Sequence, residues 1–487
     1  MMLSYINFMK IKMIWKKRKM NLDFSNLNRF FFVGIKGSGL CSLACFLKFK
    51  GYLVEGVDVP FEFYTDNLLD RNHITYYENI YDFSLKEHDK SYDILIYSPA
   101  YDKDKLLVLQ EAYELKIPVL SYPEFLGGIS KKYYSIGVAG SHGKTTTATF
   151  LSILFYKLGL GPNSILGGSV KDFGGKSSLV GSSNIFIAET CEYRNHFLHF
   201  YPDIIVLTNI DYEHVDFFAN YKAVESVFLK YINNLKHNGI LIINSDESNL
   251  VKLKDSIIRK DIKIFSFSIN SLSDFKVENL EVIDDFLRFD FLGISDIRLR
   301  TPLFHNVYNF VSALLALKLT LEKEGKLITN FDDKIKIIAR EYKGIKRRIE
   351  FIREKDGVIY LDDYAHHPKE IENTLLGIKS FYKGRRVILD FMPHTYTRTK
   401  ILFSDFVKAL SSVDILILHN ISLSVRENFD PDELSNKLFL ALKDLNSNVY
   451  FFKEIFDSVD FIKNLLKKND LFITMGAGNN FILHDFL

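Results

Sequence analysis

The chain of 487 residues is too long for one hydrophobic core, and typical domain sizes predict about three domains. Its 47% hydrophobic and 25% charged residues are typical of an ordinary soluble globular protein. The net charge of +2, from 62 Lys and Arg against 60 Asp and Glu residues, argues against nucleic acid or an anionic membrane as a partner and favours a small-molecule enzyme or a neutral binding protein.

Cysteine usage and hydropathy indicate a cytoplasmic protein. The three cysteines, Cys41, Cys45 and Cys191, form no C-x-x-C pair, which argues against a disulfide framework or a zinc site. No apolar run of about 18 residues occurs, so we expect no transmembrane helix.

Residues 1–28 are expected to form an N-terminal extension, disordered or not native before Met20. They include the only tryptophan, Trp15, but lack the order of charged start, apolar run and cleavage site that a secretory signal requires.

Residues 30–58 follow the pattern strand, glycine turn, helix, strand. An apolar run leads into Gly34, Gly37 and Gly39, a helical pattern follows, and a second apolar run ends at an aspartate. Further short apolar runs continue the alternation. This pattern predicts a parallel α/β domain over residues 29–131.

Two more stretches of the same kind follow. The first begins with "YYSIGVAG" and continues through "NIFIAET", "DIIVLTNI" and "GILIINSDE". The second includes "GVIYLDDYAHHP", "RRVILDFMPHTYTRT", "VDILILHN" and "DLFITMGAGNN". Residues 326–346, which precede the second stretch, are charged and irregular and are predicted to form a linker. Many of these strands end in polar residues, and ligands of open α/β sheets gather at the carboxyl ends of strands.

The segment "GVAGSHGKTTTATF", residues 137–150, lies between a strand pattern and a helix pattern. Backbone N–H groups of a glycine loop at a helix N-terminus bind anions, the lysine adds positive charge, and the following threonine can hold Mg²⁺. The loop is shorter than G-x-x-x-x-G-K-[ST], because Val138 stands where that pattern requires its first glycine. We predict a phosphate site formed by Gly140, Ser141, His142, Gly143, Lys144, Thr145 and Thr146.

The shortened loop G-x-x-G-K-T-T resembles the ATP loop of the Mur ligases and of the related folylpolyglutamate synthetases. Motifs elsewhere support the Mur ligases and occur in that family's order: "FVGIKGSG", "ETCEYRNHF", "TNIDYEHVD", "HNVYNFVSAL", "GIKRRIE", "DDYAHHPKE", "PHTYTRT" and "MGAGNN". The resemblance covers nearly all of residues 29–480. It departs at "MGAGNN", where the family usually has an aspartate, and at "SVREN", which covers only part of an Arg-Glu motif region.

The resemblance implies ligation of L-alanine to the carboxylate of UDP-N-acetylmuramate, driven by ATP with Mg²⁺ through an acyl phosphate, in peptidoglycan precursor synthesis. It implies an α/β fold of three domains. These are a Rossmann-like UDP-binding domain at residues 29–131, a central P-loop ATPase-like domain with a parallel sheet at residues 132–338, and a Rossmann-like C-terminal domain at residues 339–487 that closes on ATP and the amino acid.

The resemblance also implies roles for residues around ATP. Magnesium ligands are expected at Thr145, Glu189 and His214, beside the phosphate-binding Lys144. Asn306 and Asn309 lie three apart at a predicted helix start, so both can face the nucleotide side. Arg348 is expected at the phosphates and Asp363 at the ribose, with Arg347 and Asp362 as the alternatives in each doublet.

Two further sets of residues complete the expected site. Contacts to the amino acid or sugar nucleotide are expected from Tyr364, His366, His394 and Arg398, near His367 and Tyr396. The UDP pyrophosphate is expected at the first glycine cluster, through Gly34, Gly37, Ser38, Gly39 and Asp58. Lys36 departs from the family's usual glycine there, either to contact phosphate or to point to solvent.

Three alternatives stay open. A peptide-recycling ligase would join a tripeptide to the same sugar nucleotide, although "PHTYTRT" and "CEYRNHF" favour the alanine reaction. A folylpolyglutamate reaction is disfavoured by the glycine-turn domain before the ATP loop. A nicotinamide dehydrogenase or noncatalytic nucleotide-binding protein is weakened by the spacing G-x-x-G-x-G, since the dinucleotide pattern is G-x-G-x-x-G. A monomer and a homodimer are both compatible with the sequence.

Overall fold

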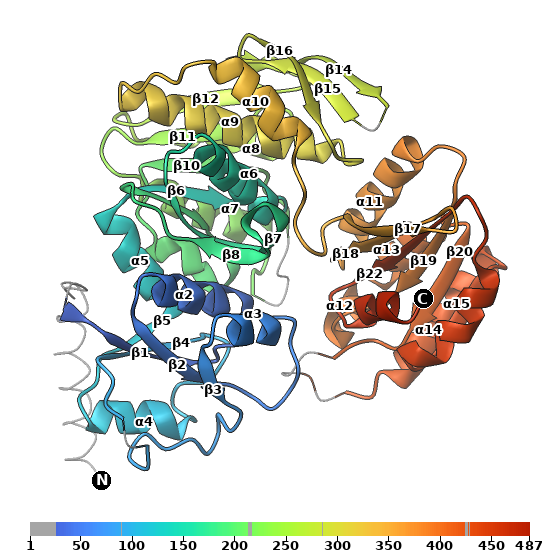
Figure 1. Cartoon of the computed structure of the whole chain (residues 1–487), viewed down its shortest axis with the longest axis horizontal. Helices are drawn as coiled ribbons and strands as arrows, with labels where there is room; N and C mark the ends of the chain where they lie inside the picture. Colours follow the sequence, from blue (N-terminus) through green and yellow to red (C-terminus); the bar gives the residue numbers. More distant parts are fainter. Residues whose placement is uncertain (1–25, 89, 213–216, 285, 424–426, 428) are drawn as a thin grey trace.

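The computed structural model describes residues 26–88, 90–212, 217–284, 286–423, 427 and 429–487. In this part of the chain the elements gather in three units along the sequence (Figure 1). The expected extension before Met20 and the predicted metal ligand His214 lie outside the described residues.

The N-terminal unit, blue in Figure 1, is a parallel sheet with the strand order β3-β2-β1-β4-β5. In β1 (Arg29–Val33), Phe30 and Phe32 pack on one face while Phe31 and Val33 pack on the other, so the strand is apolar along nearly its whole length. The other elements are β2 (Leu53–Val57), β3 (Thr75–Tyr77), β4 (Ile94–Tyr97), β5 (Val119–Ser121), α2 (Ser38–Phe49), α3 (Asp66–Arg71), α4 (Leu107–Glu114) and α5 (Tyr122–Lys132).

The central unit contains, among the described residues, a sheet of eight strands in the order β13-β12-β11-β10-β6-β9-β7-β8. All neighbours are parallel except β7 and β8. The strands are β6 (Tyr134–Ala139), β7 (Asn163–Val170), β8 (Lys176–Leu179), β9 (Ile185–Glu189), β10 (Ile204–Leu207), β11 (Ile240–Asn244), β12 (Lys263–Ser268) and β13 (Phe275–Lys276). The helices are α6 (Lys144–Lys157), α7 (Tyr221–Ile232), α8 (Ser248–Asp255) and α9 (His305–Lys323), with short turns η3 (Lys171–Phe173) and η4 (Tyr193–His199).

Two features of the central unit differ from the sequence prediction. A small antiparallel sheet, β14 (Glu278–Ile283), β15 (Phe286–Phe291) and β16 (Ile294–Leu299), follows the large sheet. The linker predicted at residues 326–346 contains a helix, α10 (Phe331–Arg340). The prediction was wrong because the charged residues of α10 hide a narrow apolar face, on which Ile335 and Ile338 are buried in the core of the central unit.

The C-terminal unit, orange to red in Figure 1, has the sheet order β17-β18-β22-β19-β20-β21. Only the edge pair β17–β18 is antiparallel among the described pairs. The strands are β17 (Glu350–Lys355), β18 (Val358–Asp363), β19 (Arg386–Phe391), β20 (Ile415–His419), β21 (Val449–Phe452) and β22 (Asp470–Met475). The helices are α11 (Pro368–Phe381), α12 (Tyr396–Ile401), α13 (Phe403–Leu410), α14 (Asp432–Leu445) and α15 (Val459–Leu465), with η5 (Ile455–Ser458) and η6 (Asn480–Asp485).

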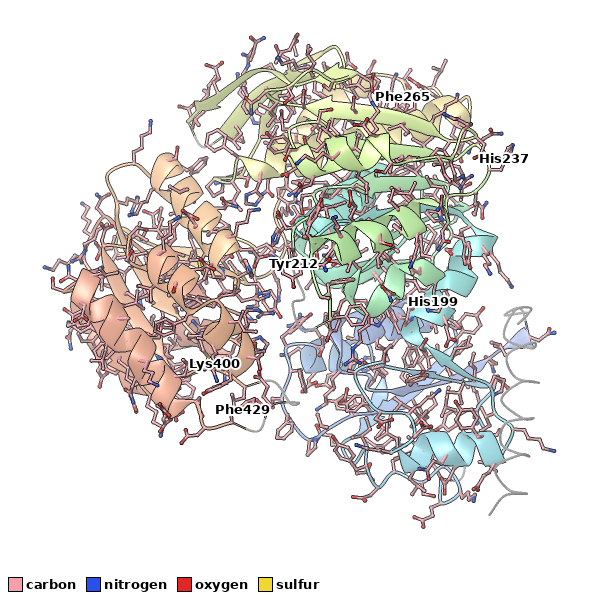
Figure 2. All side chains as sticks on the ribbon, turned by 180° about the vertical axis from the view of Figure 1, so that it is seen from behind. His199, Tyr212, His237, Phe265, Lys400 and Phe429 are labelled. Carbon is pink, nitrogen blue, oxygen red and sulfur yellow. The ribbon has the colours of Figure 1, made fainter. Side chains whose placement is uncertain are left out.

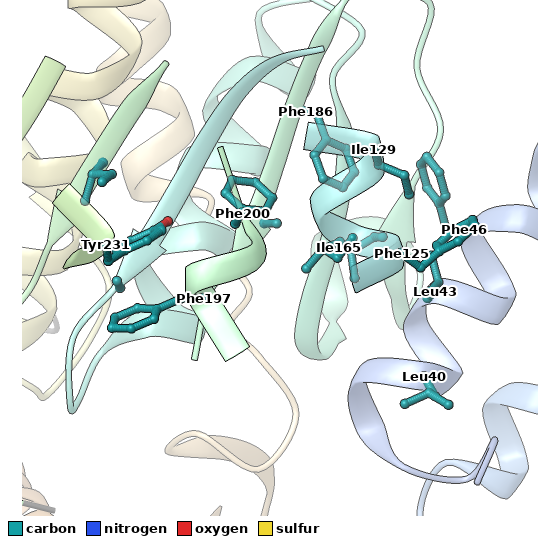
Figure 3. Packing of buried hydrophobic residues seen from close by; sticks show 14 of the residues in the cluster. Leu40, Leu43, Phe46, Phe125, Ile129, Ile165, Phe186, Phe197, Phe200 and Tyr231 are labelled. Atoms are coloured by element: carbon teal, nitrogen blue, oxygen red, sulfur yellow. The ribbon is translucent and has the colours of Figure 1, made fainter. Parts of the chain in front are cut away.

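The N-terminal and central units share one continuous hydrophobic core. Figure 3 shows Leu43 and Phe46 of α2 beside Phe125 of α5, with Ile165 and Phe186 of the central sheet next to them. The rings of Phe46 and Phe186 lie 6.0 Å apart between centroids. This packing fixes the glycine turn before α2 relative to the central sheet.

The C-terminal unit lies beside the other two (Figure 1), and Figure 2 shows Tyr212 at the edge of the central unit that faces it. The predicted α/β fold class is confirmed by these largely parallel sheets. Within the described residues, none of the helices combines the length and apolar character needed to span a membrane.

Candidate functional site

A cleft of ≈ 2920 Å³ runs between the three units. Ligand pockets commonly measure about 300–1,000 Å³, so this cleft has room for more than one substrate. Most of the predicted site residues line it: Gly34, Gly37, Asp58, Ser141, His142, Gly143, Lys144, Thr145, Thr146, Glu189, Asn306, Asn309, Arg348, Asp363, His366, His394 and Arg398. Ser38, Gly39, Gly140 and Tyr364 belong to the same segments but are outside the cleft lining.

The glycine loop connects β6 to α6 at the floor of the cleft. Gly143 has a φ of +79°, and a Cβ there would lie 2.6 Å from Oδ1 of Asn309, so only glycine fits this turn. The helix starts at the next residue, Lys144, and its first N–H groups point toward the cleft without a partner inside the helix. The loop therefore has the geometry of an anion site.

The ammonium group of Lys144 is folded over its own loop. It donates to the carbonyl oxygen of Ser141 at 2.9 Å and lies 3.2 Å from Oε2 of Glu192. Glu192 is 1% exposed. The sequence motifs predicted no role for this glutamate, although its position three residues after Glu189 was an available signal.

Thr145 and Glu189 meet beside the loop. The hydroxyl of Thr145 donates to Oε2 of Glu189 at 2.7 Å. Among the described residues no group of three His, Cys, Asp or Glu side chains is arranged to hold a metal ion. Mg²⁺ bound with a nucleotide needs only one or two carboxylates, because phosphates and waters supply the other oxygens. The two oxygen-bearing side chains would therefore fit a magnesium ion bound to the phosphates of a nucleotide.

Asn306 and Asn309 are part of a buried chain of hydrogen bonds that connects α9 to α6. The Asn309 amide donates to Oδ1 of Asn306 at 3.1 Å, and Asn309 Oδ1 accepts from the hydroxyl of Thr147 at 3.1 Å. Asn306 in turn donates to the hydroxyl of Thr301 at 2.8 Å. The two asparagines are 8% and 5% exposed, so the observed contacts join the two helices under the glycine loop.

The structure separates the two arginines of the doublet. Arg347 is 9% exposed, and its guanidinium donates to Oδ2 of Asp362 at 3.1 Å and to the carbonyl of Gly476 at 2.7 Å. It also stacks on Phe481, 4.4 Å from the ring centroid. Arg347 thus links the carboxyl end of β18 to the loop that follows β22.

Arg348 points to the negatively charged part of the cleft. Burial opposes its positive charge, but nearby carboxylates outweigh that effect and raise the pKa of the guanidinium; they belong to Glu370, Asp363 and Glu189. Since Glu189 is part of the central sheet, Arg348 lies where the C-terminal and central units meet.

The aspartate doublet divides in the same way. Asp362 pairs with Arg347 and accepts from the hydroxyl of Thr474 at 2.7 Å. Asp363 accepts from the N–H groups of Ile349 and Ala365, both at 2.7 Å, and burial raises its pKa to about 6. Asp363 holds the turn that carries the following tyrosine and histidines.

Neutral histidines and an arginine gather at the ends of β18 and β19. The rings of His366 and His394 are 6.4 Å apart, and Arg398 donates to the carbonyl of His394 at 3.3 Å. Burial lowers the pKa of His366 to about 3 and that of His394 to about 4. Both imidazoles are therefore uncharged near neutral pH, which leaves Arg398 as a cation beside two neutral hydrogen-bonding rings.

The start of α11 contacts the glycine loop of the central unit. Oε1 of Glu370 lies 3.4 Å from Nδ1 of His142, and Lys369 donates to Oδ2 of Asp211 at 2.7 Å. Sequence reasoning missed Glu370 and Asp211, because single charged residues have no periodic signal and their partners lie in another unit.

The first glycine cluster is close-packed at its start and open at its end. A Cβ at Gly34 would lie 2.8 Å from the ring of Tyr101. The carboxylate of Asp58 accepts from the N–H groups of Lys36 at 2.6 Å and Val59 at 2.9 Å, and from the Tyr101 hydroxyl at 2.6 Å. Asp58 thus holds the turn. The following Gly37 and Ser38, at the N-terminus of α2, are exposed.

Lys36 occupies neither of the two places predicted for it. Its side chain is buried, 1% exposed, and its ammonium contacts Glu78, Asp66 and the Phe61 carbonyl. The prediction was wrong because Glu78 is 42 residues away in the sequence and only the fold brings it to Lys36.

Comparison with known proteins agrees with this architecture. Family models match residues 29–134 ("Mur ligase family, catalytic domain"), 138–317 ("Mur ligase middle domain") and 347–478 ("Mur ligase, glutamate ligase domain"). A relative from Borreliella burgdorferi named UDP-N-acetylmuramate–L-alanine ligase is 65% identical over 468 residues, which are 96% of this chain and 100% of the relative. A ligase of the same name from Treponema pallidum is 34% identical over 459 residues, 93% of this chain and 95% of the relative.

Solved structures show the same fold. The UDP-N-acetylmuramate-alanine ligase of Thermotoga maritima matches with a TM-score of 0.75 at 20% identity, over 94% of this chain and 97% of that one. A murein peptide ligase from Psychrobacter arcticus matches with a TM-score of 0.68 at 20% identity, over 94% and 98%. The full-length sequence identity, the three matched family models and the glycine loop facing a three-sided cleft lead to one conclusion: the chain belongs to the Mur ligase family.

Proposed function

We propose that the protein joins L-alanine to the carboxylate of UDP-N-acetylmuramate, with conversion of ATP to ADP and phosphate. The observation that carries this proposal is the 65% identity, over the whole length of the relative, to a protein named for that reaction. The solved alanine ligase and the solved murein peptide ligase both match at 20% identity and so do not discriminate, and the identity to the named relative makes the recycling reaction the weaker candidate.

The chemistry requires an activated carboxylate. A carboxylate oxygen attacks the γ-phosphorus of ATP, the bond to the bridging oxygen breaks, and ADP leaves. The alanine amine then attacks the acyl carbon, an amide bond forms, and phosphate leaves with the former carboxylate oxygen. No side chain acts as a nucleophile in this sequence, so catalysis depends on alignment and charge stabilisation.

The residues around the glycine loop suit the phosphoryl transfer. In the ATP complex we assign phosphate contacts to the loop N–H groups and to Lys144, whose ammonium already lies over the loop. Thr145 and Glu189 are the described residues that we assign to hold Mg²⁺, which would neutralise phosphate charge when bound with ATP. His214 stays a predicted ligand.

Arg348 is the residue that we assign to the charge of the transferred phosphoryl group. It lies at the junction of the central and C-terminal units and is surrounded by carboxylates. A cation that reaches the site only when two units meet couples domain closure to catalysis. Asn309 is assigned a positioning role, because its side chain holds α9 against the loop and α6.

The other two substrates are assigned to the ends of the cleft. The open N-terminus of α2, at Gly37 and Ser38, suits a diphosphate. The cation of Arg398 beside the uncharged His366 and His394 suits the carboxylate of alanine. Tyr364 and Asp363 then position this end of the cleft.

We further propose a cytoplasmic enzyme that supplies peptidoglycan precursor and so supports cell shape and division. The domain boundaries remain the proposed ones, residues 29–131, 132–338 and 339–487. A monomer or a homodimer is compatible with this assignment.

The test is phosphate release with ATP, UDP-N-acetylmuramate and one of two acceptors, L-alanine or the tripeptide. We expect turnover that requires all three substrates and prefers alanine. Preference for the tripeptide would support the recycling reaction, and release independent of any acceptor would contradict both.

A further inference from the structure

The loop that leads from β2 to α3 forms one wall of the cleft beside the N-terminus of α2. We call residues 59–65 the strap. Four consecutive residues of the strap, residues 61–64, line the cleft, and two of them are aromatic side chains with large exposed fractions, Phe61 at 57% and Tyr64 at 37%. An exposed aromatic wall next to a diphosphate site suits the base and ribose of a nucleotide.

The strap has little regular structure of its own, and Lys36 contacts it at two points and contacts the residue before it at a third. At its start, the Lys36 N–H donates to Asp58, the residue before the strap, at 2.6 Å. In its middle, the Lys36 ammonium donates to the carbonyl of Phe61 at 2.9 Å. At its end, the hydroxyl of Thr65 donates to the Lys36 carbonyl at 2.5 Å.

The first and last of these contacts use the Lys36 backbone, and the contact to Phe61 uses its ammonium, which has no donor left for another partner. An ammonium has three N–H donors, and three acceptors surround this one: the Phe61 carbonyl, Glu78 at 2.5 Å and Asp66 at 3.4 Å. The ring of Tyr76 lies 5.1 Å from the ammonium. A buried cation is tolerated only when it is paired and hydrogen-bonded, so moving Lys36 toward a phosphate would leave two carboxylates without their cation.

We propose that Lys36 is a positioning residue for the sugar nucleotide: it holds the strap in the conformation that covers the nucleotide half of UDP-N-acetylmuramate. This inference rests on the proposed function. Lys36 touches no substrate; it acts through residues 61–64. Without it, the strap is ordered for only part of the time, and the apparent affinity falls in proportion to the ordered fraction.

The experiment measures steady-state phosphate release while each of the three substrates is varied in turn. Lys36→Met roughly keeps the length of the side chain but removes its charge. Glu78→Gln weakens the ion pair with Lys36 by changing its more exposed partner. Lys90→Met is the matched control. Lys90 pairs with Glu55 on the same sheet, is 40% exposed and does not line the cleft.

For Lys36→Met we expect KM for UDP-N-acetylmuramate to rise about tenfold or more, with KM for ATP and alanine within about twofold of wild type. Glu78→Gln should show a smaller rise in the same constant, and Lys90→Met none. A folded Lys36→Met with an unchanged KM for the sugar nucleotide, or with equal losses for all three substrates, overturns the inference. If Lys36→Met does not fold, Glu78→Gln decides, and behaviour identical to Lys90→Met overturns the inference.

The wild-type enzyme separates this inference from the proposed function. If wild-type turnover does not depend on UDP-N-acetylmuramate, the proposed function fails, and the inference fails with it. If the wild type depends on the sugar nucleotide while the variants match the Lys90 control, only the role of Lys36 is overturned.

Discussion

Arg347 and Arg348 are adjacent in the sequence, but we expect one to stabilise the fold and the other to stabilise the transition state. One matched pair of substitutions tests both roles. Both arginines line the cleft, but Arg347→Met removes a buried guanidinium that donates to Asp362 and Gly476, whereas Arg348→Met removes one that lies near carboxylates of both units. The two changes are chemically identical and one residue apart. We expect the first to lower stability and the second to lower turnover.

The contacts of the two arginines set the expected losses of stability and of turnover. Removing one partner of a buried ion pair costs about 3–5 kcal/mol, and about 1 kcal/mol shifts the Tm of a domain of roughly 150–250 residues by about 2–4 °C. Arg347→Met should therefore lower the Tm of the C-terminal unit by about 6–20 °C. Among the described residues Arg348 has carboxylates nearby but no ion pair as close as that of Arg347, and losing one group that stabilises transition-state charge typically lowers kcat by about 10²–10³-fold.

The assay combines thermal unfolding followed by circular dichroism with phosphate release below the Tm of both variants. An Arg347→Met variant that keeps the wild-type Tm while its kcat falls, together with an Arg348→Met variant that loses stability but not turnover, would contradict the two roles. That result would assign the catalytic role to Arg347 and the structural role to Arg348.

Three further predictions follow from the site. Lys144→Ala should lower kcat by at least about 10²-fold, and because it breaks the ion pair with the buried Glu192, the double variant Lys144→Ala/Glu192→Gln should be more stable than Lys144→Ala but no more active; near-normal turnover of either variant contradicts the loop assignment. Glu189→Gln should raise the Mg²⁺ concentration for half-maximal activity by about 10–100-fold, and an unchanged Mg²⁺ titration argues against this ligand. Burial lowers the pKa of His366 to about 3, against roughly 6.5 in the unfolded chain, so the unfolded state binds more protons between these values. The stability that comes from keeping this imidazole neutral is complete above pH ~6.5 and is lost as the pH falls toward about 3. Urea unfolding of His366→Gln should therefore depend less on pH, by up to about 1.4 kcal/mol per pH unit, and an unchanged slope contradicts a neutral buried imidazole.

Hydrophobic patterns and turn residues correctly predicted individual strands and the strand-to-helix turn at the glycine loop. The apolar β1 is buried on both faces, and the glycine loop connects a strand to a helix as its residue types require. The motifs also brought most of the predicted residues to one cleft, because strand ends of parallel sheets share one edge.

The remaining features depend on contacts that are distant in the sequence. The sequence could not decide between Arg347 and Arg348, because the arginine with a structural role is identified only by its contacts to Asp362 and Gly476, which are distant in the sequence. Lys36 could not be placed without Glu78, and Glu370 could not be noticed without His142 from another unit. Helix α10 was missed because its buried residues are few and lie among charges.

The central claim is that a carboxylate of the sugar nucleotide is activated by ATP and transferred to alanine. The most direct measurement uses UDP-N-acetylmuramate with heavy oxygen in its carboxylate and follows the label by mass spectrometry. We predict that, only when ATP and alanine are both present, one heavy oxygen appears in the released phosphate for each amide bond formed. Amide formation without transfer of label to phosphate, or labelled phosphate without any dependence of amide product on alanine, would contradict the account.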